Sequence, residues 1–323
     1  MASRALRLVF FGTPAFAVPT LQAMLDSPHD VVGVVTQPDR PRGRGQQVLP
    51  SAVKELAVRH SLPVLQPDRL KDDTFLTSLD EWHAELGVVA AYGKILPAAV
   101  LALPPLGLIN VHASLLPRHR GAAPIHRAVI AGDVTTGVSI MGVVQALDAG
   151  PVFATVYRVI GPDDTSVQVE RDLAVLGARL LVDVVDALAD GRARAVPQDE
   201  SAVTYAARLE KDEGLIDWAL DAEEIHNRVR GLQPWPMAWT YLDGRRLVIV
   251  QTRRVTEGVG EAAGPGTVLA VLRDALRVST GSGPLDITAL QPEGRRVMTA
   301  RDFVAGSRIS PGVLFTSSAV ASA

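Results

Sequence analysis

The chain has 323 residues, of which 47% are hydrophobic and 21% are charged, and its formal net charge is −3. This length exceeds the usual size of one domain, so we expect two domains, each with its own core. The chain has no cysteine, which excludes disulfides, thiolate nucleophiles and cysteine metal sites. No apolar run approaches the ~20 residues that span a bilayer, and no signal-peptide pattern opens the chain, so we expect a cytoplasmic protein without a membrane segment.

Strand-like and helical segments alternate in the first half of the chain. Apolar strands are predicted at residues 4–11, 31–36, 88–91 and 108–111, and amphipathic helices at 15–25, 51–60 and 124–131. Such alternation predicts an α/β fold built on a Rossmann-like, doubly wound and mostly parallel sheet.

Two β-rich segments break the parallel pattern. Residues 136–144 and 152–160 are separated by a connection too short for a crossover helix, so we expect them to pair as antiparallel strands. A long helix should begin near Thr165 or Ser166 and stop at Gly191, where it would close a first domain over residues 1–191.

The periodicity fades after this helix. We interpret residues 192–209 as a linker and residues 210–323 as a second domain. The second domain has short β-branched segments divided by Gly or Pro turns, at residues 239–242, 246–252, 266–272, 275–280 and 284–290. This spacing predicts a small β-barrel.

Two polar residues, Asn110 and His112, stand at the end of the apolar strand 108–111. Residues two apart on a strand project to the same face, so both would point into the crevice where open α/β sheets hold ligands. The alternative is that both side chains only bond a neighbouring loop, since buried polar groups need partners.

Asp148 lies in the turn between the two predicted antiparallel strands, from which its carboxylate could reach the same crevice and orient His112. A structural role in the turn is the alternative. Together, Asn110, His112 and Asp148 offer an oxyanion donor, a proton shuttle and a carboxylate, which are the groups that transfer between amines requires.

Three arginines, Arg40, Arg42 and Arg44, lie in a loop rich in proline and glycine at residues 37–47. Guanidinium groups bind phosphate well, although a solvated charge run explains the same pattern. The turn at residues 12–14 lacks the glycine spacing of a dinucleotide site, which argues against an NAD-dependent dehydrogenase. No histidine pair at metal-binding spacing lies on a predicted helix, so we expect no metal.

Four segments in this order, NVH at 110–112, SLLP at 114–117, RGAAPI at 120–125 and LDAGP at 147–151, closely resemble the folate-dependent formyltransferase superfamily. Further segments extend the resemblance over nearly the whole chain, to the branch of that superfamily that formylates methionyl-tRNA. They lie at residues 11–14, 37–41, 91–94, 211–213, 216–218 and 234–236.

The resemblance implies transfer of a formyl group from 10-formyltetrahydrofolate to the free amine of initiator methionyl-tRNA. We expect a monomer, and a transfer that needs no metal. It implies three sets of residues: catalytic Asn110, His112 and Asp148; folate-binding Ser114, Leu115, Leu116 and Pro117; and tRNA-binding Arg40, Arg42, Arg44 and Lys211. It also implies that the second domain is an oligonucleotide-binding (OB)-like barrel that supports the tRNA. His119 departs from the motif, which usually carries an aromatic residue there.

Two other functions remain open. One is a folate-dependent formyltransferase or formyl-folate hydrolase that acts on a small molecule with the same three residues, which would need little beyond the first domain. The other is a non-catalytic RNA-binding module built on the same scaffold, which would bind no folate.

Overall fold

The computed structural model describes residues 4–42, 47–255 and 263–318, and these residues divide into two compact units. The amino-terminal unit contains the chain up to Pro124, together with Thr135–Val159 and Glu170–Ala206. The carboxyl-terminal unit contains Ile125–Val134, Ile160–Val169 and the chain from Ala207 onward.

A seven-stranded sheet forms the centre of the amino-terminal unit, in the order β10-β9-β7-β6-β1-β2-β5. Its strands are β1 (Arg7–Gly12), β2 (Asp30–Val35), β5 (Val64–Leu65), β6 (Leu86–Ala90), β7 (Leu108–His112), β9 (Thr135–Gly142) and β10 (Val152–Val159). The first five are parallel, β9 runs antiparallel to β7, and β10 runs antiparallel to β9. The predicted mostly parallel sheet with an antiparallel pair is therefore confirmed.

Helices cover both faces of this sheet, as its strands require, since β1 is buried along almost its whole length. The amino-terminal unit contains η1 (Ala15–Ala17), α1 (Val18–Leu25), α2 (Ala52–Arg59), α3 (Asp73–Asp80), α4 (Ala98–Leu101), η2 (Glu200–Ala202) and most of α6 (Ser166–Ala189). Ser51 caps α2 by accepting a hydrogen bond from the Lys54 backbone N–H at 3.1 Å.

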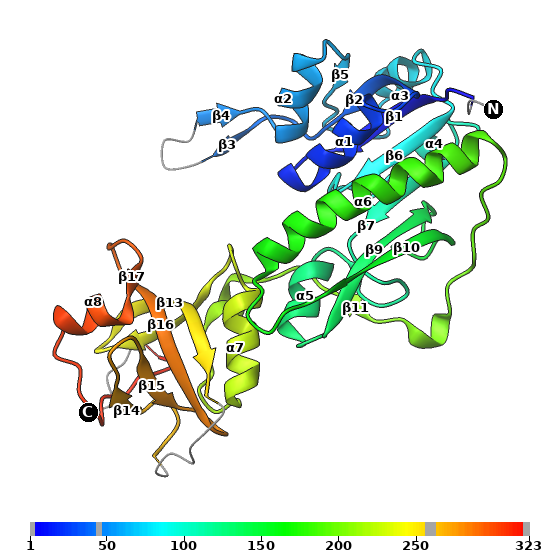
Figure 1. The fold of residues 1–323 in the computed structure, drawn as a ribbon. Coiled ribbons are helices and arrows are strands. Elements are labelled where there is room, and N and C mark those ends of the chain that lie inside the picture. Colours follow the sequence, from blue (N-terminus) through cyan, green and yellow to red (C-terminus); the bar gives the residue numbers. More distant parts are fainter. Residues whose placement is uncertain (1–3, 43–46, 256–262, 319–323) are drawn as a thin grey trace. The chain divides into compact units, whose positions relative to one another are not determined.

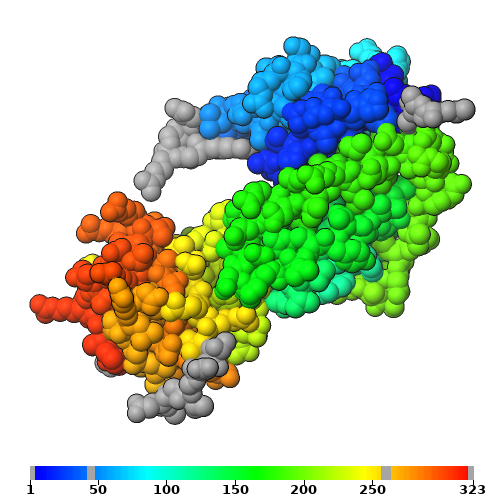
Figure 2. All heavy atoms as spheres, viewed as in Figure 1, coloured from blue at the N-terminus to red at the C-terminus, as the bar shows by residue number. Residues whose placement is uncertain are grey.

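The long helix α6 crosses one face of the sheet (Figure 1), and its outer surface is open to view in Figure 2. Gly177 permits a close approach, since a Cβ there would lie 2.8 Å from the Val111 side chain. Gly191 follows the helix with a φ of +67°, in agreement with the predicted stop. Residues from α3 and α4 pack on the opposite face, against Phe11 and Leu108 among others.

Smaller paired segments complete the amino-terminal unit. Strands β3 (Arg40–Arg42) and β4 (Gln47–Leu49) pair antiparallel in the segment that was predicted only as an exposed loop, and the hairpin projects away from the sheet in Figure 1. Strands β8 (Arg120–Gly121) and β11 (Tyr205–Ala206) pair parallel.

The carboxyl-terminal unit contains an antiparallel sheet in the order β12-β13-β16-β15-β14, with β17 on β16. Its elements are most of α5 (Pro124–Ile130), η3 (Lys211–Gly214), α7 (Ala222–Gly231), β12 (Ala238–Leu242), β13 (Arg245–Arg254), β14 (Val268–Val271), β15 (Leu276–Ser279), β16 (Pro284–Pro292), β17 (Met298–Thr299) and α8 (Ala300–Ala305). The core includes Trp218, whose ring stacks on Phe315 and whose indole N–H donates to Thr240 Oγ1 at 3.0 Å.

A buried histidine joins α7 to β13 within this unit. His226 is 3% exposed, and its Nδ1 and Nε2 lie 2.9 Å from Thr252 Oγ1 and 2.9 Å from the Pro162 carbonyl oxygen. Burial lowers the pKa of His226 below its ordinary value, since the charged imidazolium is poorly solvated there; the Pro162 carbonyl and Asp163 oppose this effect and Arg230 adds to it.

We predict that acidification destabilises the carboxyl-terminal unit through His226. His226 binds a proton less readily in the folded state than in the unfolded chain. The stability that the neutral, buried ring contributes is therefore fully present above pH 6.5 and is lost as the pH falls below that value. The free energy of unfolding should then fall by up to about 1.4 kcal/mol per pH unit, the slope for uptake of one proton. Urea denaturation between about pH 7.5 and 5 measures it, and His226→Gln should flatten the dependence; an equal slope in both proteins would contradict the assignment.

Candidate active site

The polar crevice begins at the carboxyl end of β7. Asn110 pairs with Val89 of β6 and Met141 of β9, and His112 pairs with Ser139 of β9, so strand pairing sets the positions of both residues. Asn110 and His112 share one face of β7, as the strand alternation predicts. His112 is 5% exposed and Asn110 is half-buried.

The ring of His112 has a defined orientation. Its Nε2 lies 3.0 Å from the backbone carbonyl oxygen of His119. Because a carbonyl oxygen can only accept, Nε2 carries a proton whenever this bond is made. Nδ1 is then the nitrogen that exchanges a proton, and it lies 3.7 Å from Asp148 Oδ2, longer than a hydrogen bond.

Asp148 is held in an uncommon backbone conformation, with a φ of +47°. One of its carboxylate oxygens, Oδ2, accepts a hydrogen bond from the Gly121 backbone N–H at 2.9 Å. The structure therefore brings His112 and Asp148 together and turns the same carboxylate oxygen toward both the imidazole and Gly121. The backbone groups of His119 and Gly121 were not predicted, because backbone donors and acceptors leave no residue signal in a sequence.

Asn110 differs from its neighbours in the crevice. Within the described residues its side-chain amide makes no hydrogen bond to another protein group, although the residue is half-buried. An unpaired amide on the same strand face as His112 is available to donate to a bound oxygen atom.

The segment after β7 contains the residues predicted to bind folate. Ser114 is fully buried, and its hydroxyl donates to the Arg118 carbonyl oxygen at 2.6 Å, so this side chain is engaged within the protein. Leu115, Leu116 and Pro117 are half-buried and leave apolar surface accessible. Ser139 Oγ donates to the Ser114 carbonyl at 2.8 Å and accepts from the Leu116 N–H at 3.1 Å, which ties this segment to β9.

The predicted tRNA-binding residues lie in both units. Arg40 is exposed at the start of β3, and Arg42 ends that strand; Arg44 lies outside the described residues. Lys211 is exposed and begins η3 in the carboxyl-terminal unit.

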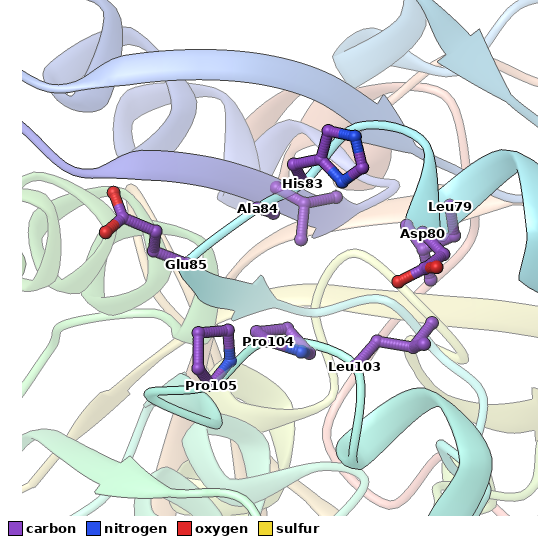
Figure 3. A pocket seen from close by; sticks show the side chains of 9 residues that line it. Leu79, Asp80, His83, Ala84, Glu85, Leu103, Pro104 and Pro105 are labelled. Carbon is purple, nitrogen blue, oxygen red and sulfur yellow. The ribbon is translucent and has the colours of Figure 1, made fainter.

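A cavity of about 250 Å³ lies elsewhere in the amino-terminal unit, at the amino end of β6 (Figure 3). Asp80, His83, Glu85 and Pro104 line it, and none of the predicted site residues does. The Arg7 backbone N–H, with Arg4, holds the pKa of the Glu85 carboxyl below its usual range, so this carboxylate already has partners. This cavity is distinct from the crevice.

Residues 4–42, 47–255 and 263–318 offer neither a metal centre nor a membrane-spanning helix. No group of three or more His, Asp or Glu side chains is placed to hold a metal ion in that part of the chain. No helix among the same residues is long and apolar enough to cross a membrane.

Fold and crevice together define a Rossmann-like α/β protein with an amide, an imidazole and a carboxylate at the carboxyl edge of its sheet. The sequence profile described as Formyl transferase matches residues 6–185, and the profile described as Formyl transferase, C-terminal domain, matches residues 208–308. The chain belongs to the formyl transferase family.

Curated relatives match almost the whole chain. A methionyl-tRNA formyltransferase from Heliobacterium modesticaldum is 48% identical over 316 residues, which cover 96% of this chain and 100% of the relative. A methionyl-tRNA formyltransferase from Pelobacter propionicus is 46% identical over 314 residues, covering 97% of each chain.

A solved structure shares the fold at much lower identity. The N-formyltransferase from Helicobacter canadensis, in complex with folinic acid and dTDP-3-aminofucose, superposes with a TM-score of 0.66 at 14% identity and covers 88% of this chain and 99% of its own. This likeness concerns the fold alone.

Proposed function

We propose that this protein is an enzyme that transfers the formyl group of 10-formyltetrahydrofolate to the free amino group of initiator methionyl-tRNA. The product, N-formylmethionyl-tRNA, serves translation initiation. The observation that carries the proposal is the near full-length match, at 42–48% identity, to curated relatives named methionyl-tRNA formyltransferase. The crevice of Asn110, His112 and Asp148 supplies the chemistry that such a transfer requires.

The residues at the crevice fit a folate co-substrate. Leu115, Leu116 and Pro117 present accessible apolar surface next to the strand that carries the unpaired Asn110 amide. Apolar walls with a few placed polar groups are the usual composition of small-molecule sites. Ser114 would contribute to this pocket by holding the backbone of residues 114–118 in place, since its buried hydroxyl donates to the Arg118 carbonyl oxygen.

The co-substrate supplies the formyl carbon and a nitrogen leaving group, and methionyl-tRNA supplies the amine that attacks this carbon. Asn110 would donate a hydrogen bond to the formyl oxygen as negative charge develops there, and His112 would add a second donor, Nδ1–H, once its ring has taken up the proton of the amine. His112 Nδ1, beside Asp148, would take part in moving the proton of the amine toward the departing nitrogen. With Nε2 bonded to the His119 carbonyl, the ring keeps its orientation during the transfer.

The tRNA contacts are proposed for Arg40, Arg42 and Arg44, which follow β2, and for Lys211. Guanidinium groups at the β3–β4 hairpin would bind the phosphates of the acceptor end. Gln66 stabilises the base of this hairpin, because its Nε2 donates to Asp39 Oδ1 at 2.7 Å and to the Gln37 carbonyl at 2.9 Å.

The proposal extends to domain roles. Residues 1–191 would form the catalytic domain, 192–209 a connecting segment, and 210–323 an OB-like barrel that supports the tRNA. Pairing at both sheet edges supports barrel closure: Thr316 and Tyr241 of β12 exchange backbone hydrogen bonds of 2.9 and 3.0 Å, and the Val313 carbonyl accepts from Val268 of β14 at 2.8 Å. We also propose a cytoplasmic monomer, in keeping with a role in translation.

A small-molecule acceptor is the competing function. The Helicobacter canadensis enzyme shows that a similar fold accompanies a sugar nucleotide, but it is only 14% identical to this chain, whereas the methionyl-tRNA formyltransferases are 42–48% identical. The fold therefore leaves the acceptor open, and the sequence relationship favours methionyl-tRNA.

We predict that Asn110→Ala, His112→Ala and Asp148→Ala each lower kcat for formylation of methionyl-tRNA. Loss of an oxyanion donor costs ~10²–10³-fold and loss of a general acid or base ~10²–10⁴-fold. Steady-state kinetics with charged initiator tRNA measure these losses. Folded variants with near wild-type turnover would refute the catalytic assignment.

Arg44→Ala should weaken tRNA binding instead. Neutralising one phosphate fewer reduces counterion release, so the dependence of log Kd on log salt should flatten by about 0.9 if Arg44 binds a single phosphate. Binding of charged tRNA at several salt concentrations measures both effects. An unchanged affinity and an unchanged salt slope would exclude a phosphate-binding role for Arg44.

A further inference from the structure

A segment between the two matched profile regions borders the crevice. Residues 196–206, here called the strap, follow the first region, which ends at residue 185, and precede the second, which begins at 208. Val196 exchanges two backbone hydrogen bonds of 2.8 Å with Val152, next to the turn that carries Asp148. At its other end, β11 pairs with β8, next to His119.

The strap also supports the loop that orients His112. Thr204 Oγ1 accepts from the His119 backbone N–H at 2.9 Å, and the Thr204 carbonyl accepts from the Arg120 N–H at 2.9 Å. The His119 carbonyl, which accepts from His112 Nε2, belongs to the residue held in this way. The strap therefore bonds both the loop that orients His112 and the strand end next to the turn that carries Asp148.

Gln198 makes the direct contact with the Asp148 turn. Its Nε2 donates to the Asp148 carbonyl oxygen at 2.8 Å and to the Gly150 carbonyl oxygen at 2.7 Å. Both hydrogens of the amide are thus used, and they hold the turn on either side of Ala149. Asp148 needs such support, since its φ of +47° is costly for a residue other than glycine.

Arg120 determines which way the Gln198 amide faces. Its Nε and Nη2 donate to Gln198 Oε1 at 3.0 and 2.8 Å, and its Nη1 and Nη2 donate to the Glu200 carboxylate at 3.2 and 2.8 Å. Arg120 is 3% exposed, and its guanidinium can only donate. The amide oxygen must therefore face Arg120, which leaves the amide nitrogen facing the two carbonyls of the turn.

We propose that Gln198, oriented by Arg120, is a positioning residue for formyl transfer that keeps the Asp148 carboxylate beside His112 Nδ1. The inference rests on the proposed function, since it assigns Gln198 a role only through Asp148. Gln198 bonds the backbone of the turn rather than the carboxylate, so it acts on the placement of Asp148. A displacement of about 1 Å at a reacting group can cost ~10²-fold in rate.

The test uses the full-length protein with Gln198→Glu and Gln198→Ala. The glutamate variant is nearly isosteric and retains an acceptor for Arg120, but its carboxylate has no hydrogen to donate to the two carbonyls. We expect kcat for methionyl-tRNA formylation to fall ~10–100-fold in both variants. KM for tRNA and for the folate should stay within about 3-fold, because the Gln198 amide nitrogen and oxygen are both already bonded to protein groups.

Gln233→Ala is the matched control. The Gln233 amide also donates to two backbone carbonyls, those of Val229 at 3.2 Å and Val250 at 2.9 Å, but it lies in the carboxyl-terminal unit. The Gln233→Ala variant therefore loses the same type of interaction as Gln198→Ala, but its kcat should stay within about 2-fold of wild type. A fall in kcat as large as that of Gln198→Ala would show a general stability effect and overturn the proposal.

A double-mutant cycle with Asp148→Asn separates positioning from structure. In that background Gln198→Glu should cost less than about 3-fold, because the group it positions is already impaired. An equal loss in both backgrounds, or wild-type kcat in folded Gln198→Glu and Gln198→Ala proteins, would overturn the proposal. Near wild-type turnover of Asp148→Asn itself would instead refute the catalytic role of Asp148, and with it the basis of this inference.

Discussion

Backbone pairing of β7 on both sides is the constraint on which the crevice depends. β7 lies between parallel β6 and antiparallel β9, so a shift in register would break two ladders and move Asn110 and His112 to the opposite face. The polar residues are therefore held at the carboxyl edge by strand pairing that buries the rest of β7. The supports of the crevice then come from the 119–121 loop, which closely follows β7, and from the Asp148 turn, which lies further along the chain.

Much of the amino-terminal fold was predictable because its signals are local. Continuous apolar runs marked the buried strands, and a short connection distinguished the antiparallel β9–β10 pair from the parallel ones. The same strand alternation placed Asn110 and His112 on one face. The approach of Asp148 to His112 was an expectation based on the turn position, and the 3.7 Å separation agrees with it.

The remaining features depend on long-range pairing that has no local periodicity. Residues 192–209 show no periodicity and were interpreted as a linker, yet Val196, Gln198 and Thr204 within them bond the turn and the loop that support the crevice. The Gln198 bond to Asp148 joins residues 50 apart, and its acceptor is a backbone carbonyl that any residue would provide. The β3–β4 hairpin was missed because its strands have three residues each and include a proline.

The most direct test of the account is acceptor competition with purified wild-type protein. 10-Formyltetrahydrofolate is supplied together with charged initiator tRNA, free methionine and glycinamide ribonucleotide, and the formylated products are quantified. We expect formyl transfer to methionyl-tRNA and none above background to the two small molecules. Folate turnover with formylation of a small molecule, or with no formylated acceptor, would contradict it and favour the small-molecule or hydrolase function.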